Sequence, residues 1–262
     1  MLMQLQHPHI VQFYGVSYHD QHYYIVQELC KGSMYDILNP IDQIPGAPIE
    51  DYDFNDPKLM ITWAAGIARG LAFMHAKSIV HRDLKPQNIL IDRSRAGVPK
   101  ISKICEFGLS GMYDSMKGRQ TKVAGTAAYL APEVIGMNHA EVATPVDVFA
   151  FAVTFWWMLH RTDPYPKLGE PQILMGVFQR GLRPTVSPDC PENIAALIED
   201  CWVEDPTQRP TMVNILERIY TILDSNTYQL LELPLAIPPE EFLNQANSRK
   251  ESKESKDSNQ SE

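Results

Sequence analysis

The sequence predicts an α+β protein with a short strand-rich start and a long helical remainder. Two runs of β-branched and aromatic residues lie within 9–29, and the polar stretch SYHDQH separates them, which is typical of a β-hairpin. Beyond residue 56, apolar residues recur at helical spacing in several segments. Between these parts, the acidic, proline-containing stretch 39–56 is expected to form an exposed loop.

The first long helix is predicted to begin at Asp56-Pro57, an N-cap carboxylate followed by a first-turn proline. Its apolar residues recur every three or four positions and define one buried face: Met60, Ala64, Ile67, Leu71 and Met74.

A second helix is predicted to begin at Thr144-Pro145, with Thr144 as N-cap and Asp147 near the positive end of the helix dipole. The segment that follows, VFAFAVTFWWML, is apolar on all sides, so this helix should be buried. Two further helices are expected at about 191–202 and 210–223.

Composition excludes several classes of protein. Hydrophobic residues make up 44% of the 262 residues and charged residues 21%, as in an ordinary globular protein. The net charge of −9 argues against nucleic-acid binding. The longest apolar run, 148–159, is shorter than the roughly 20 residues that a membrane span needs. The four cysteines have no disulfide or metal-site spacing, so we expect a cytoplasmic protein.

Residues 81–88, HRDLKPQN, carry the strongest chemical signal. Phosphoryl transfer needs a carboxylate that orients the acceptor hydroxyl and takes its proton, and Asp83 suits that role. Lys85 supplies a compact cation that can neutralise charge on the transferring group. Asn88 offers a neutral oxygen to Mg²⁺. The spacing fits the pattern H-R-D-L-x-x-x-N.

With this loop, the chain resembles the protein kinases, specifically the tyrosine-kinase-like branch with a Ser/Thr-type catalytic loop. The matching motifs, in family order, are HPHIVQFYGV (7–16), YYIVQELCKGSMYDIL (23–38), IVHRDLKPQNILID (79–92), EFGLS (106–110), GTAAYLAPEV (125–134), DVFAFAV (147–153) and CWVEDPTQRPT (201–211). The resemblance implies a kinase fold, ATP and Mg²⁺ as cofactors, and a protein substrate. Lys85, two positions after Asp83, favours serine or threonine as the acceptor.

The same resemblance assigns residues to the nucleotide site. Glu28, Leu29 and Cys30 match the hinge, where backbone groups of Glu28 and Cys30 would hydrogen-bond the adenine edge. Gln27 takes the gatekeeper position, and Leu90 is assigned to the same site.

Other family roles concern the framework of the fold. Glu133 is expected to pair with a buried Arg209, the alternative being two solvated charges, and Asp147 is expected to anchor the catalytic loop or simply to cap its helix. Four residues match the hydrophobic spine that links the two lobes: Leu2, Phe13, His81 and Phe107.

The resemblance divides the chain into a remnant of the kinase N-lobe (1–35), a C-lobe (36–223) and a C-terminal extension (224–262) expected to be disordered from about 244. The chain is expected to begin inside the helix that carries the ion-pairing glutamate, as an N-terminally truncated domain. No G-x-G-x-x-G or V-A-I-K motif occurs in the 262 residues.

Two departures fall inside the matched motifs. Glu106 stands where the metal-binding aspartate of D-F-G is usual, which adds one methylene between backbone and carboxylate. Mg²⁺ demands nearly ideal octahedral geometry, so we expect this change to impair catalysis. Ala152 replaces a glycine in the buried helix, with little expected effect.

Three functional hypotheses follow. The first is a Ser/Thr protein kinase domain with impaired or no activity in this form. The second is a pseudokinase that serves as a scaffold or allosteric partner, and the third is a docking module built from the helical lobe alone. If the kinase is regulated in the usual way, an upstream kinase would act on Ser115 or Thr121, with Arg82 receiving the phosphate.

Overall fold

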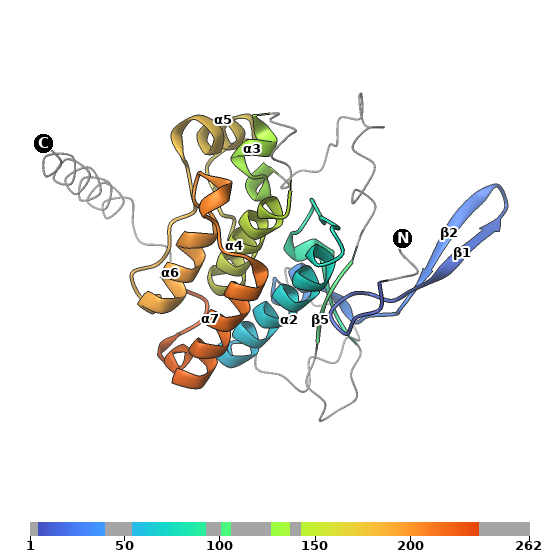
Figure 1. The fold of residues 1–262 in the computed structure, drawn as a ribbon, viewed down its shortest axis with the longest axis horizontal. Helices are drawn as coiled ribbons and strands as arrows, with labels where there is room; N and C mark the ends of the chain where they lie inside the picture. The colour runs from blue at the N-terminus through green and yellow to red at the C-terminus, as the bar shows by residue number, and fades with distance from the viewer. Residues whose placement is uncertain (1–4, 40–53, 93–100, 106–126, 137–142, 236–262) are drawn as a thin grey trace, which may run out of the picture.

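A computed structural model describes residues 5–39, 54–92, 101–105, 127–136 and 143–235 of the protein. A body of packed helices forms most of the molecule, and a two-stranded hairpin projects from it (Figure 1). The predicted combination of a short strand-rich start and a helical remainder is confirmed. Residues 40–53 of the loop predicted at 39–56, and the predicted disordered tail from 244, lie outside the described residues.

The hairpin consists of antiparallel strands β1 (Phe13–His19) and β2 (His22–Gln27), as predicted. Asp20 and Gln21 form its turn, with φ angles of 47° and 60°. Positive φ at both central residues is the geometry of a type I′ turn, which matches the twist of the flanking strands. All of β2 and most of β1 are exposed, so this hairpin contributes little to the core of the described structure.

Helix α2 (Pro57–His75) begins where the sequence predicted, because the Asp56 side chain accepts a hydrogen bond of 2.9 Å from the Lys58 backbone N–H. All five residues of its predicted apolar face are buried. At Gly70 a side chain would collide with a neighbouring segment, since its Cβ would lie 2.8 Å from the His9 carbonyl oxygen. Glycine therefore lets the segment before the hairpin pass directly over α2.

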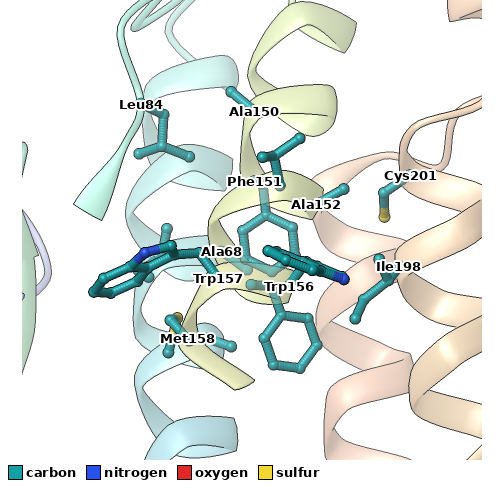
Figure 2. Close-up of a cluster of buried hydrophobic side chains, with 14 of the residues drawn as sticks. Ala68, Leu84, Ala150, Phe151, Ala152, Trp156, Trp157, Met158, Ile198 and Cys201 are labelled. Atoms are coloured by element: carbon teal, nitrogen blue, oxygen red, sulfur yellow. The ribbon is translucent and has the colours of Figure 1, made fainter. Parts of the chain in front are cut away.

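Helix α4 (Pro145–His160) is the centre of the core, as its uniformly apolar sequence predicted, and all its residues after Pro145 are buried. In Figure 2, Trp157 points toward the α2 side and Trp156 points toward Ile198 of α6 (Glu192–Cys201). Ala152, the predicted departure from glycine, is fully buried in this cluster.

The prediction that Thr144 caps α4 needs correction. Thr144 occupies the N-cap position, but its φ and ψ of −52° and −28° are already helical, and its side chain makes no capping hydrogen bond. A capping side chain needs an extended backbone to reach the N–H groups of the first turn, and this residue lacks one.

A small sheet lies beside α2 and supports the loop of residues 81–88. It joins β3 (Gly32–Ser33), β4 (Ile89–Ile91) and β5 (Ser102–Ile104) in antiparallel order. The short helix α1 (Met34–Leu38) follows β3 directly, and Ser33 caps it by accepting a hydrogen bond from the Asp36 backbone N–H.

The described ranges contain four more α-helices: α3 (Pro132–Ile135), α5 (Glu170–Arg180), α6 and α7 (Met212–Ser225). Helices α6 and α7 confirm the two predicted at 191–202 and 210–223, whereas α1, α3 and α5 were not predicted. No helix in the described ranges is both long and apolar enough to cross a membrane.

The chain continues past α7 along the helical body. Tyr228, Leu231 and Leu235 are buried, and the Leu235 N–H donates a 2.8 Å hydrogen bond to the Leu159 carbonyl near the end of α4. The predicted start of a C-terminal extension at 224 therefore lies within packed structure, and the extension as a separate unit stays a prediction.

Candidate active site

Three predicted catalytic residues lie together in the loop that follows α2. The Lys85 Nζ atom lies 3.1 and 3.0 Å from the two carboxylate oxygens of Asp83. The Asn88 amide nitrogen donates to the Asp83 carbonyl oxygen at 2.7 Å and to its Oδ2 at 2.8 Å. Lys85 and Asn88 are buried, so the carboxylate is oriented by two neighbours that have little freedom to move.

Asp147 holds the backbone of this loop from the first turn of α4. Its Oδ1 accepts a hydrogen bond from the Arg82 N–H, and its Oδ2 accepts one from the His81 N–H, both at 2.8 Å. The His75 Nε2 also lies 2.8 Å from Oδ2. The predicted anchoring role of Asp147 is therefore confirmed, and the carboxylate is fully buried.

Arg82 needs this support because its φ of 70° lies in the left-handed region, which costs a non-glycine residue energy. Two backbone N–H groups bound to one carboxylate, those of His81 and Arg82, fix the chain on either side of that conformation. The strained residue lies immediately before Asp83, so its fixed backbone sets the direction in which the Asp83 side chain leaves the chain.

His81 connects the loop to the end of β5. Its Nδ1 accepts a hydrogen bond from the Asp83 N–H at 3.3 Å, so its Nε2 carries the proton and donates to the Cys105 carbonyl at 2.9 Å. The Cys105 N–H in turn donates to the Asn88 carbonyl at 3.0 Å. Cys105 directly precedes the predicted metal ligand Glu106, which lies outside the described residues, as do Leu2 and Phe107 of the predicted spine.

A second cluster surrounds the predicted hinge. A cavity of about 380 Å³ brings all four predicted nucleotide-site residues together; its walls are Ile25, Val26, Gln27, Glu28, Leu29, Cys30, Gly32 and Leu90. Burial and the nearby Glu28 carboxylate raise the pKa of the Cys30 thiol to about 11. The thiol is therefore protonated at neutral pH and adds a small apolar surface to the wall.

Two residues that sequence reasoning missed contact the hinge. The Lys103 Nζ atom of β5 lies 3.0 Å from Glu28 Oε1, and the Gln12 N–H donates to Glu28 Oε2 at 3.2 Å. A charged residue in the short segment Ile101-Ser102-Lys103-Ile104 gave the only sequence signal for Lys103, and nothing in the sequence indicated its partner.

The predicted pair of Glu133 and Arg209 is confirmed as a buried, bidentate ion pair. Their two nitrogen–oxygen contacts measure 2.7 and 2.9 Å, and at most 4% of either side chain is exposed. The alternative of two solvated charges is therefore wrong. The pair joins α3 to the segment before α7, and it fixes the chain that follows residues 106–126.

Asn88 suits a hard metal ion. Its amide nitrogen is used in both bonds to Asp83, which sets the orientation of the amide and leaves its oxygen outside those two contacts. Carbonyl-type oxygens are ligands that Mg²⁺ accepts. The described part of the chain has no cluster of three or more histidine, cysteine or acidic side chains that could hold a metal by itself.

The helical body, the hinge cavity and the loop around Asp83 bring together the motifs that resemble a protein kinase domain. The family model described as "Protein kinase domain" matches residues 1–221. The chain therefore belongs to the protein kinase domain family, as its motifs predicted.

Curated relatives agree with this family. The chain is 34% identical to mitogen-activated protein kinase kinase kinase 12 of Rattus norvegicus, over 82% of this chain and 22% of that protein. It is 33% identical to the probable serine/threonine-protein kinase drkC of Dictyostelium discoideum (84% and 28% covered). It is 32% identical to the serine/threonine-protein kinase STY46 of Arabidopsis thaliana (85% and 36% covered). The chain thus spans between a fifth and about a third of the length of these relatives.

Proposed function

We propose that this domain transfers the γ-phosphate of ATP to serine or threonine hydroxyls of a protein substrate, with low activity in the 262-residue form. The observation that carries the proposal is the cluster of Asp83, Lys85 and Asn88, in which Lys85 and Asn88 each contact the Asp83 carboxylate at 2.8 to 3.1 Å. Two of the relatives above are named serine/threonine kinases, which supports that acceptor class.

The proposed chemistry follows from the atoms of this cluster. The oxygen of the substrate hydroxyl attacks the γ-phosphorus of ATP, and the Asp83 carboxylate accepts the hydroxyl proton. The bond between the γ-phosphorus and the β-phosphate oxygen breaks, and ADP leaves. Lys85, next to that carboxylate, neutralises charge on the transferring group. When bound, Mg²⁺ would supply further neutralisation of the phosphates, with Asn88 and Glu106 as proposed ligands. The cytoplasmic location and the substrate protein remain proposals.

A pseudokinase scaffold is the second candidate, and the observation that favours it is Glu106. In the same 262 residues no phosphate-binding G-x-G-x-x-G and no V-A-I-K lysine occur. A scaffold, however, has no chemical use for a carboxylate held between a lysine and an asparagine, so the phosphotransferase remains our leading proposal.

The test is transfer of radiolabelled γ-phosphate from ATP by the purified chain to a generic Ser/Thr substrate protein. We expect labelled serine and threonine at a rate below the roughly 1–100 s⁻¹ usual for kinases. Asp83→Asn should lower that rate at least about 10²-fold, because the variant cannot accept the hydroxyl proton. Thermal unfolding of the variant serves as the control for folding.

Label on tyrosine alone, or transfer unchanged in Asp83→Asn, would contradict the proposal. A complete lack of transfer, combined with retained nucleotide binding, would favour the scaffold.

The Glu106→Asp variant tests the proposed metal site separately. The shorter side chain should restore the reach of a metal-ligating carboxylate, so transfer should rise several-fold or reach half-maximum at lower Mg²⁺. The measurement is a Mg²⁺ titration of phosphate transfer at fixed ATP. Glu192→Asp, the same shortening at an exposed glutamate of α6, should give no such gain. Lower phosphate transfer by Glu106→Asp would show that the longer glutamate side chain is the better one at this position, and it would contradict the proposed effect on the metal site.

Regulation by an upstream kinase at Ser115 or Thr121 stays a prediction, since both lie outside the described residues.

A further inference from the structure

The hinge is joined to β5 by a charged contact that the proposed transfer chemistry does not use. The Lys103 Nζ atom lies within 3.0 to 3.1 Å of both carboxylate oxygens of Glu28. Only 10% of the Lys103 side chain and 26% of the Glu28 side chain are exposed, so water screens the pair much less than a surface ion pair. The two residues are 75 positions apart in the sequence.

Glu28 is held through its backbone as well as its side chain. The Gln12 N–H donates to Glu28 Oε2 at 3.2 Å, and the Glu28 N–H donates to the Gln12 carbonyl at 2.8 Å. These two bonds close a ring between the start of β1 and the hinge, and Lys103 holds the carboxylate that forms one side of it. The position of the Glu28 peptide, including its carbonyl, therefore depends on the Lys103 charge.

The strand that carries Lys103 is itself fixed on both sides. The Val11 N–H donates to the Ile104 carbonyl, and the Ile104 N–H donates to the His9 carbonyl, each at 2.9 Å. One residue further, Cys105 bonds to Asn88 of the catalytic loop. Lys103 thus extends from a rigid strand that already contacts the catalytic loop and reaches the hinge on its other side.

We propose that Lys103 is a positioning residue for nucleotide binding: through Glu28 it fixes the hinge backbone that is to hydrogen-bond the adenine edge. This proposal rests on the proposed kinase function, because only nucleotide binding gives the hinge backbone a ligand. Neither Lys103 nor the Glu28 carboxylate needs to touch the nucleotide. Their contribution is to hold the donor and acceptor groups in place before binding, so less ordering is required when the nucleotide enters.

The experiment measures the dissociation constant of a fluorescent ATP analogue, with Mg²⁺, for the full chain and four variants. Lys103→Met removes the charge and keeps much of the apolar stem, and Glu28→Gln leaves an oxygen that can accept from Gln12. Each should weaken binding about 10-fold, the effect of one lost charged hydrogen bond. The double variant should bind no more weakly than either single variant, because both changes break one contact. Lys58→Met, at an exposed lysine of α2, should bind like the wild type.

Hydrogen exchange provides a readout that does not depend on a bound nucleotide. Amides of residues 24–32 should exchange about 10-fold faster in Lys103→Met, while amides of α4 keep their protection. A lower melting temperature with unchanged affinity and unchanged local exchange would show a merely structural role and overturn the proposal. If the wild type binds no nucleotide, the kinase function is contradicted, and unaltered exchange at 24–32 would separately contradict the ordering of the hinge by Lys103.

Discussion

Replacing Arg209 with methionine is expected to destabilise the fold by about 3–5 kcal/mol, because it leaves the buried Glu133 carboxylate without its partner. The guanidinium also donates to the carbonyls of Val203 and Pro145 and lies 5.2 Å from the centre of the Phe149 ring. Methionine fills part of the space but satisfies none of these acceptors. The free energy of unfolding is measured by urea denaturation at neutral pH.

A surface ion pair in the same domain supplies the matched control. Arg218 contacts Asp200 at 2.8 Å, close to the 2.7 Å between Arg209 and Glu133. Here, however, 35% of the Arg218 side chain and 56% of the Asp200 side chain are exposed. Arg218→Met should therefore cost at most about 1 kcal/mol. Similar losses in the two variants would show that burial does not set the strength of the Glu133–Arg209 pair.

Acidification from pH 6.5 to pH 4 is expected to remove roughly 3 kcal/mol of stability through His160 alone. Burial lowers the pKa of this imidazole to about 4, against an ordinary value of 6.5. The folded state therefore favours the neutral ring, and the unfolded state binds an extra proton between these two values. The contribution is fully present above pH 6.5 and is lost as the pH falls toward 4.

The contacts of His160 explain why the charged ring fits poorly. Its Nδ1 donates to the Trp156 carbonyl at 2.9 Å, its Nε2 accepts from the Ser187 N–H at 3.2 Å, and the ring stacks on Trp156. A proton on Nε2 would face the Ser187 N–H. Unfolding free energies of the wild type and His160→Gln, measured from pH 7 to 4, should converge as the pH falls. The exposed His19→Gln is the control, and parallel curves for all three proteins would contradict the prediction.

The long helices could be predicted because the apolar residues of each one follow the spacing of the helix face that is buried. In α2 one apolar face is buried, and in α4 all sides are apolar and buried, so hydrophobic spacing alone was enough to predict both helices. Helix α5 could not be predicted in this way, because it buries only Ile173, Gly176 and Val177 and exposes Met175 and Phe178. Strands of two or three residues, such as β3 and β4, are too short to show any alternation.

Part of the candidate site could likewise be predicted from the sequence, and part could not. Asp83, Lys85 and Asn88 lie within six positions, so a motif and the chemistry it requires were sufficient to find them. Lys103 and Gln12 bind Glu28 across large separations in sequence, and only the folded chain brings them together. Thr144 does occupy the predicted N-cap position, but its side chain makes no capping bond, because a local pattern indicates the start of the helix and not the backbone angles there.

The segment that follows α7 changes where the folding unit ends. The kinase family match stops at residue 221, yet Tyr228, Leu231 and Leu235 are buried against the helices. Without these three residues, the apolar surface that they cover would be exposed. The Leu159 carbonyl near the end of α4 would also lose the hydrogen bond from the Leu235 N–H. The buried contacts of the described chain therefore extend past the family match, at least as far as Leu235, and a fragment cut at residue 221 would lose them.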